Sequence, residues 1–305
     1  MKKVNIIGSG FSSLSAACHL AKRGFQVEVY EKNSSLGGRA RQFKQDGFTF
    51  DMGPSWYWMP DVFERFFQGF GKKVSDYYQL ERLDPGYQVV FGKDDVFPVS
   101  DSIQKIADRF ETEEKGSGRK LISFLNQAKR NYEVAIDDLV YKPGVSPLEL
   151  ITPATVKNVG LFLTNVRKQV ERDFQSPKLR SLLQFPVLFL GAKPEKTPAF
   201  YNFMNYADFG LGTWHPKGGM IQIVNAMVSL AEELGVRFHT DAPVAEILTK
   251  NKTASGIRVG DNVHESDIIV SGADYHHTES LLQASLRGYS QAYWQKKIFA
   301  PSSLL

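Results

Sequence analysis

The chain has 305 residues, of which 42% are hydrophobic and 23% charged, a composition typical of globular proteins and a length sufficient for about two domains. Its formal net charge of +4 is small and dispersed, which argues against a nucleic-acid-binding protein. Cys18 is the only cysteine, so the sequence offers neither an intramolecular disulfide nor a zinc site. Runs of about 18 apolar residues are absent, and we therefore expect no membrane-spanning helix.

The first part of the chain predicts a strand, a glycine turn, a helix and a second strand. Residues 4–7 form a short apolar run typical of a buried parallel strand, and Gly8 and Gly10 interrupt it. Residues 12–23 then carry apolar side chains at helical spacing. A second apolar run ends in Glu31, so the whole segment has the span of a βαβ unit.

The turn has the residues that a dinucleotide phosphate site needs, with one exception. Gly8 permits a tight turn, Gly10 lets the backbone approach a pyrophosphate, and the helix start offers N–H groups to the phosphates. Ser13 stands where a third glycine is usual. A serine there keeps the helix and the strand slightly farther apart, but it removes no N–H donor to the phosphates. Glu31 lies 21 positions beyond Gly10, as expected for a carboxylate that binds ribose hydroxyls and disfavours NADP. The alternative is a glycine turn in another βα fold.

A second glycine pair, Gly37 and Gly38, followed by Arg39, comes directly after this carboxylate. Together with "GFTFDMGPS" at 47–55, it resembles the signature of two-dinucleotide-domain flavoproteins, which include amine oxidases, protoporphyrinogen oxidase and carotenoid desaturases. The resemblance implies FAD as the cofactor, with the glycine pair and Arg39 along its pyrophosphate and ribityl chain and residues 47–55 near the flavin ring. An ordinary hairpin after a Rossmann-like unit is the alternative for this stretch.

The residues that the resemblance implies for FAD binding extend from the first loop to a distant strand. The full set is Gly8, Ser9, Gly10, Phe11, Ser12, Ser13, Glu31, Lys32, Gly38, Arg39, Gly53, Pro54, Ser55 and Val244. Val244 would give backbone contacts to the adenine, and its alternative is a plain core position. No metal site and no catalytic residue is predicted, because His215, His276 and His277 are expected at turns or helix starts.

The rest of the chain predicts a helical insertion and then a return to the cofactor domain. Helical spacing is clear over 121–139 and 220–234, and strands are predicted within 236–240, 243–250, 254–260 and 266–274, with a hairpin turn at "NKT". The expected fold class is α/β, a Rossmann-like FAD-binding domain of the two-dinucleotide-domain type with an inserted, largely helical substrate domain. We expect the FAD-binding domain over 1–85 and 215–285, the substrate and membrane-facing domain over 86–214, and an incomplete return to the latter over 286–305.

Four longer stretches resemble a narrower group, the bacterial phytoene desaturase family. They are "GFTFDMGPSWYWMP", "LDPGYQVVF", the stretch from "FPVLFLGAKPEK" to "TWHPKGGM", and "GADYHHTESLL". The resemblance implies an FAD-dependent enzyme of carotenoid biosynthesis that transfers hydride from a CH–CH group of a polyisoprenoid to flavin N5. It also implies a quinone or oxygen as the electron acceptor. A flavin amine oxidase and a non-catalytic Rossmann-like binding or assembly protein stay open as alternatives.

An apolar polyisoprenoid has no charge or hydrogen-bonding group, so burial of apolar surface must supply its binding. The candidates for the wall of such a tunnel are Trp56, Tyr57, Trp58, Phe185, Phe189 and Phe200, each with a core role as the alternative.

A basic amphipathic helix is predicted within residues 153–180. Its apolar face would hold Val156, Val159, Leu163, Val166 and Val170, with Lys157, Arg167, Lys168 and Arg172 nearby. Such a helix can lie in a membrane interface, where the substrate would be dissolved, or can be a solvated face over a core. The expected localisation is cytoplasmic, with peripheral contact at the inner face of the cell membrane if the first interpretation holds.

Members of the resembled family continue well beyond the position of Leu305, with a second glycine-rich flavin segment. This chain ends in "FAPSSLL", which looks like part of a strand of the substrate domain. We therefore expect a C-terminally truncated family member that, taken alone, binds FAD weakly and is inactive.

Overall fold

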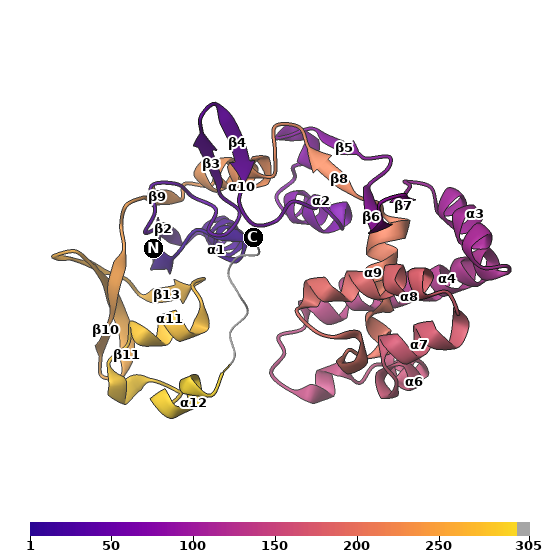
Figure 1. Ribbon diagram of the computed structural model, residues 1–305. Coiled ribbons are helices and arrows are strands. Elements are labelled where there is room, and N and C mark those ends of the chain that lie inside the picture. Colours follow the sequence, from indigo (N-terminus) through magenta and orange to yellow (C-terminus); the bar gives the residue numbers. More distant parts are fainter. Residues whose placement is uncertain (298–305) are drawn as a thin grey trace. The chain divides into compact units, whose positions relative to one another are not determined.

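The computed structural model describes residues 1–297 and contains two compact units (Figure 1). Unit 1 comprises residues 1–55, 75–79 and those from Pro216 onward, and unit 2 comprises residues 56–74 and 80–215. Unit 2 is thus inserted into unit 1 in the sequence. The final strand expected at "FAPSSLL" lies outside the described residues.

The first boundary differs from the one expected at residue 85. Helix α2 (Pro60–Gln68) belongs to unit 2, where the Arg65 guanidinium donates to the carbonyl oxygen of Ile136 at 3.0 Å. Leu83 follows strand β5 (Leu80–Arg82), and its N–H donates to the carbonyl oxygen of Thr213 at 3.0 Å. These contacts join both elements to the insertion.

A parallel four-stranded sheet forms the centre of unit 1. Its order is β13 (Ile268–Ser271), β1 (Lys3–Ile7), β2 (Gln26–Tyr30) and β9 (Arg237–His239). Every neighbouring pair is parallel, so the carboxyl ends of all four strands lie at one edge. Helix α1 (Phe11–Lys22) connects β1 to β2 and packs against α10 (Ile221–Glu233), which confirms the predicted βαβ unit and the α/β fold class.

The predicted hairpin at "NKT" is also confirmed. Strands β10 (Val244–Lys250) and β11 (Thr253–Val259) are antiparallel, and Asn251 and Lys252 between them have φ of 53° and 62°, as a tight turn of two left-handed residues requires. The remaining elements of unit 1 are β3 (Gln42–Gln45), β4 (Phe48–Asp51), β12 (Asn262–Glu265), α11 (Tyr275–Ser280) and α12 (Gln291–Gln295).

Glu28 is a charged residue inside the parallel sheet, with only 7% of its surface exposed. Its carboxylate accepts hydrogen bonds from Tyr30 Oη at 2.7 Å and Lys3 Nζ at 3.1 Å, and lies 3.1 Å from His239 Nε2. Burial alone would raise the pKa of Glu28, but the hydrogen bonds from Tyr30, Lys3 and His239 outweigh it and lower the pKa to about 2.

We therefore expect the unfolding free energy to fall as the pH drops from about 4.5 to about 2. In this range Glu28 takes up a proton in the unfolded chain but stays ionised in the folded chain, which favours unfolding. The Glu28 contribution to this loss is about 3 kcal/mol. Urea titrations across this pH range measure the loss of unfolding free energy. This loss should be about 3 kcal/mol smaller in a Glu28→Gln variant, which has no carboxylate to protonate at this position. Equal losses in both chains would contradict the assignment.

Unit 2 is largely helical, as expected, apart from two small sheets, β6 (Tyr87–Gly92) with β7 (Asp95–Val99) and β5 with β8 (Trp214–Pro216). Its helices are α2, α3 (Ile103–Glu113), α4 (Ser117–Asp137), α5 (Pro153–Lys157), α6 (Val159–Leu163), α7 (Val166–Asp173), α8 (Pro177–Gln184) and α9 (Phe203–Asn205). Strand β8 lies at the end of the insertion. The core of unit 2 includes Phe97, Phe110 and Phe174, whose rings meet edge to face.

Helix α4 begins inside the glycine-containing segment "EEKGSGR". The Glu111 carboxylate accepts hydrogen bonds from the N–H groups of Gly116 and Gly118, and Ser117 Oγ donates to the carbonyl oxygen of Phe110 at 2.6 Å. These bonds fix the corner between α3 and α4.

The single amphipathic helix predicted within 153–180 is wrong. The segment forms four short helices, α5 to α8, because Asn158 leaves helical geometry after α5, Thr164 is extended after α6, and the Asn165 side chain caps the start of α7. Val166 and Val170 are fully buried in the core, whereas Leu163 is 83% exposed. The five apolar residues therefore do not share one face.

Candidate functional site

The first glycine loop lies at the carboxyl end of β1 and is held by the neighbouring strands. Gly8 has a φ of +83°, and its N–H donates to the carbonyl oxygen of Tyr30 at 2.8 Å. Gly10 precedes α1, no side chain caps that helix, and a Cβ added to Gly10 would meet nothing within 4 Å. The start of α1 is therefore open to an anionic ligand, as a phosphate site requires.

Glu31 follows β2 and is almost fully buried, with 3% of its surface exposed. Its Oε2 accepts hydrogen bonds from the N–H of Ser9 at 3.0 Å and from Ser9 Oγ at 2.7 Å. Its Oε1 accepts from the N–H of Asn33 at 3.0 Å and from the Asn33 side-chain amide. Burial would raise the pKa of Glu31, but these hydrogen bonds outweigh it and hold the pKa below its ordinary value. Glu31 is therefore ionised at neutral pH and ties the first loop to β2.

The second glycine pair lies directly on the first loop. The N–H of Gly37 donates to the carbonyl oxygen and to Oγ of Ser9, both at 3.1 Å. Gly38 has a φ of +60°, and a Cβ there would lie 3.0 Å from Gly10 Cα. Gly53, with a φ of +89°, is so close to the carbonyl group of Arg39 that a Cβ would overlap the oxygen. Three motifs that are separate in the sequence thus pack directly against one another.

The other predicted cofactor residues differ in their exposure. Ser12, Lys32, Arg39, Pro54 and Ser55 are exposed, and Phe11 is half-buried. Val244 packs in a core cluster with Ile7 and Tyr30, so its core role is confirmed, and its contact with adenine stays a prediction. Two residues earlier, the N–H of Ala242 donates to the carbonyl oxygen of Glu31 at 2.9 Å.

Ser13 stands at the position of the missing third glycine, and a glycine from a distant part of the chain leaves room for its side chain. Ser13 is 1% exposed, and a Cβ on Gly272 would overlap Ser13 Oγ and lie 3.1 Å from Ser13 Cβ. Gly272 follows β13, and its N–H donates to the carbonyl oxygen of Ile7 at 3.0 Å. The space that a third glycine would leave in α1 is therefore provided by Gly272, which the sequence analysis did not single out. In the sequence, Gly272 is marked only by its position directly after a predicted apolar strand.

The three histidines lie in a strand and in a short helix. His276 and His277 lie in the first turn of α11, where the Asp274 side chain accepts from the N–H of His276 at 3.0 Å, which confirms the expected helix start. His215 lies in strand β8, so its expected turn position is wrong. Within residues 1–297, no cluster of His, Cys, Asp and Glu could hold a metal ion.

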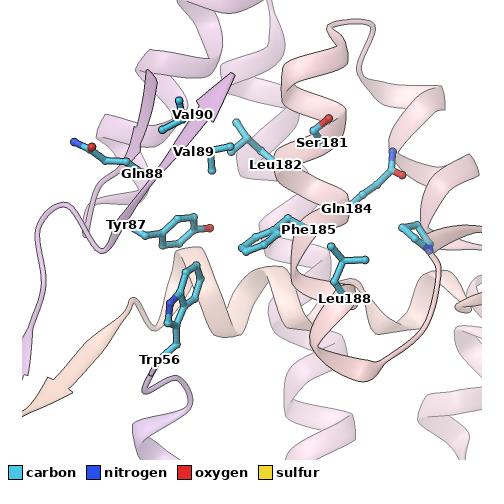
Figure 2. A pocket seen from close by; sticks show the side chains of 11 residues that line it. Trp56, Tyr87, Gln88, Val89, Val90, Ser181, Leu182, Gln184, Phe185 and Leu188 are labelled. Atoms are coloured by element: carbon cyan, nitrogen blue, oxygen red, sulfur yellow. The ribbon is translucent and has the colours of Figure 1, made fainter. Parts of the chain in front are cut away.

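Unit 2 contains a pocket of about 520 Å³ between β6 and α8 (Figure 2). Its lining comprises Trp56, Tyr87, Gln88, Val89, Val90, Ser181, Leu182, Gln184, Phe185, Leu188 and Pro194. The Trp56 ring lies 4.5 Å from the Tyr87 ring and 5.6 Å from the Phe185 ring, measured between centroids. The wall is therefore mainly apolar and rich in aromatic side chains.

The six aromatic residues predicted as tunnel walls divide into three pairs. Trp56 and Phe185 line the pocket, and Trp58 and Phe189 pack against Trp56. Tyr57 and Phe200, by contrast, are 1% and 3% exposed and have the core role that was their alternative.

Comparison with known proteins matches residues 11–295 to the family described as flavin containing amine oxidoreductase. The chain is 43% identical to the carotenoid 3,4-desaturase of Haloarcula japonica, over 99% of this chain and 62% of that protein. It is 35% identical to a zeta-carotene-forming phytoene desaturase of Myxococcus xanthus, over 90% of this chain and 53% of that protein. The chain thus spans between about half and three fifths of these relatives.

Among solved structures, an oxidoreductase from Methanosarcina mazei aligns with a TM-score of 0.63 at 22% identity, over 96% of this chain and 64% of that chain. At this identity the match shows the fold alone. A search of the helices within residues 1–297 finds none that is both long and apolar enough to cross a membrane.

Proposed function

Because this chain belongs to the flavin-containing amine oxidoreductase family, we propose that it forms the FAD-binding and substrate-binding part of a carotenoid desaturase. The observation that carries the proposal is the direct packing of the two glycine loops on each other and on the buried Glu31, in a chain that is 43% identical to a carotenoid desaturase. FAD, when bound, supplies the hydride acceptor for the removal of hydrogen from a CH–CH group.

The residues of unit 1 fit the adenosine and pyrophosphate parts of FAD. The open start of α1 beside Gly10 suits the pyrophosphate, and the exposed guanidinium of Arg39 suits an anionic group next to it. The ionised Glu31 suits the ribose hydroxyls. Its two oxygens already accept four hydrogen bonds, so a ribose hydroxyl would replace the Ser9 hydroxyl or the Asn33 amide.

The pocket of unit 2 suits one stretch of a polyisoprenoid chain. Its walls are formed by aromatic and branched side chains such as Trp56, Phe185 and Leu188, so binding would come from apolar burial and the exclusion of water. A quinone or oxygen as the electron acceptor is supported by the family resemblance. An amine oxidase and a non-catalytic assembly protein have less support, because the matched relatives are desaturases.

Contact with a membrane is supported by an exposed apolar surface on unit 2, over residues 140–163, which shares Val156, Val159 and Leu163 with the predicted helix. Large apolar side chains are more than half exposed at Val140, Tyr141, Val145, Leu148, Leu150, Ile151, Val156, Val159 and Leu163. The exposed Lys157 lies among them in the sequence and would meet anionic headgroups, whereas Lys142 Nζ already donates to the carbonyl oxygen of Glu149 at 2.9 Å and pairs with Asp138 at 3.4 Å. We propose that this surface rests on the inner face of the cell membrane.

Vesicle flotation with anionic lipids tests this surface. Val145→Glu combined with Leu163→Glu is expected to reduce the vesicle-bound fraction severalfold, because both side chains are 83% exposed and would carry charge into the lipid. Val263→Glu, at a half-exposed valine of unit 1, is the matched control. Equal flotation of both variants and the unaltered chain would contradict the assignment.

The desaturase proposal is tested by expressing the whole reading frame that encodes this sequence in cells that accumulate phytoene. The expected product has a longer conjugated system and absorbs at longer wavelength. Oxidation of amines with unchanged phytoene would favour the amine oxidase instead. A folded protein that acts on neither class would favour the assembly protein.

A further inference from the structure

Unit 2 contains a row of buried polar side chains that the proposed function does not use. Asn202, Asn205 and Asp208, here called the polar row, follow one another at intervals of three residues through three successive short helical turns within residues 199–210. All three side chains are at most 1% exposed. Helix α4 packs against each of these turns and contributes Asn131, which is also 1% exposed. Burial of so many amide and carboxyl groups is unfavourable unless each of them is hydrogen-bonded.

The Asn202 end of the polar row has its partners within the protein. Asn202 Oδ1 accepts a hydrogen bond from Asn131 Nδ2 at 2.8 Å. Asn202 Nδ2 lies 3.3 Å from the side-chain oxygens of both Gln127 and Gln169. Gln169 Nε2 in turn donates to Gln127 Oε1 at 2.7 Å. These four amides therefore join α4, α7 and the start of the polar row.

The rest of the polar row has unmet atoms. Asn205 Nδ2, Asn205 Oδ1, Asp208 Oδ1 and Asn131 Oδ1 are buried and have no hydrogen-bond partner among the described residues. Asp208 is bonded only through its other oxygen, which accepts from Tyr87 Oη at 2.5 Å. Each buried polar group that is left unmet costs about 1–3 kcal/mol, and such groups are rare in folded proteins. Four of these atoms on three residues therefore indicate a bound partner.

The direction of packing brings the unmet atoms into one seam, the contact between α4 and the polar row. At one end of the seam Asn131 meets Asn202. Just beyond the other end, Phe209 belongs to the same core cluster as Leu125, which comes earlier in α4. The two segments thus run antiparallel, and the middle of the polar row lies beside the middle of this stretch of α4. Ala128, which is fully buried and has a small side chain, lies in that stretch.

The kinds of unmet atom decide which ligand fits. They comprise three acceptor oxygens and the NH2 group of Asn205, and exchanging the two ends of the Asn205 amide leaves this count unchanged. A metal cation would meet the oxygens but not the NH2 group, and an anion would meet only the NH2 group. A water molecule both donates and accepts two hydrogen bonds, so it serves both kinds of atom.

We propose that the seam between α4 and the polar row is a binding site for internal water, which bridges Asn131, Asn205 and the inner oxygen of Asp208. The water connects the four-amide cluster to the acid that holds Tyr87 in the wall of the aromatic pocket. It thereby fixes the π-helical turn Tyr206–Gly210 against α4. The inference does not depend on the proposed function, because it rests on the unmet atoms alone.

A crystal structure of the chain, at a resolution that shows ordered water, tests the site directly. We expect at least one water within about 3.2 Å of an Asn205 side-chain atom and of either Asn131 Oδ1 or Asp208 Oδ1. A seam without water, in which the Asn205 amide bonds directly to Asn131 or Asp208, would overturn the inference.

Two variants of Asn205 test the site in solution, with urea unfolding as the measurement. In a hydrated seam, Asn205→Ala leaves space that a further water can fill, whereas Asn205→Leu displaces water and leaves the oxygens of Asn131 and Asp208 unmet. The equilibrium constant for unfolding should therefore be about tenfold larger in Asn205→Leu than in Asn205→Ala. A dry seam gives the opposite order, because alanine would leave a cavity that leucine would fill.

Asn126 is the matched control, because it is an exposed asparagine of α4. Asn126→Leu and Asn126→Ala should differ little from each other, since the two residues have similar helix propensities. Asn205→Leu that unfolds no more readily than Asn205→Ala would contradict a water site. The crystal structure keeps the proposal testable if Asn205→Leu does not fold.

Discussion

A chain with Glu31→Ala is expected to bind FAD about 100-fold more weakly than the unaltered chain, the effect of losing one or two hydrogen bonds to a charged group. The same change should lower the unfolding free energy by about 3 kcal/mol, because four donors from Ser9 and Asn33 lose their acceptor in a buried place. Glu31 thus has two roles, as the proposed ribose ligand and as the group that fixes the first glycine loop.

Flavin fluorescence titration and urea unfolding measure these two effects separately. Glu246→Ala is the matched control, because Glu246 is a partly exposed acid of unit 1 whose carboxylate pairs with Arg258 at 3.1 Å, away from the glycine loops. Glu31→Gln should fall between the two variants, since the amide keeps one acceptor oxygen. Unchanged FAD affinity in Glu31→Ala would remove this residue from the cofactor site.

The second large effect is expected at Gly272. A methyl group there would overlap Ser13 Oγ, and overpacking of this kind costs about 1–3 kcal/mol while displacing α1 from β1. Gly272→Ala should therefore destabilise the fold and weaken FAD binding about tenfold or more, because the start of α1 would move. Adding Ser13→Gly to the same chain removes the overlapping atoms and should restore most of both losses.

Gly160→Ala is the control for this pair of changes, because a Cβ on Gly160 meets nothing within 4 Å. The double-mutant cycle gives a coupling free energy between residues 13 and 272. A coupling free energy near zero would mean that Gly272→Ala destabilises the chain equally with Ser13 and with Ser13→Gly. This result would show that the side chains at residues 13 and 272 do not compete for the same space.

The sequence predicted the local parts of the fold well because their signals are local. The βαβ unit follows from a β-branched run, two glycines and an apolar helical stripe within one short segment, and the hairpin turn at residues 251–252 follows from neighbouring residues. The strands β6 and β7 were missed inside a region assigned to helices. The predicted amphipathic helix was wrong because helical spacing continued across Asn158, which separates α5 from α6, and across Asn165, whose side chain caps α7.

The parts of the site that could not be predicted depend on contacts between distant residues. Ser13 and Gly272 are 259 positions apart, and no feature near Ser13 shows that its side chain has been given space. Tyr87 and Asp208 are 121 positions apart, and each alone is an ordinary residue of its segment. Only the folded chain shows that Gly272 leaves space for the Ser13 side chain. It also shows that Tyr87, in a pocket wall, is hydrogen-bonded to the buried Asp208.

We propose that unit 1 binds a flavin dinucleotide through the Gly8–Gly10 loop and Glu31. Calorimetric titration of the purified chain with FAD and with FMN separates the contribution of this site from that of the flavin ring, because FMN has the flavin ring but lacks the adenosine ribose and the second phosphate. FAD should bind at least about tenfold more tightly than FMN, and Glu31→Ala should remove the difference. Equal affinity for FAD and FMN, or a preference for FAD that survives in Glu31→Ala, would contradict it.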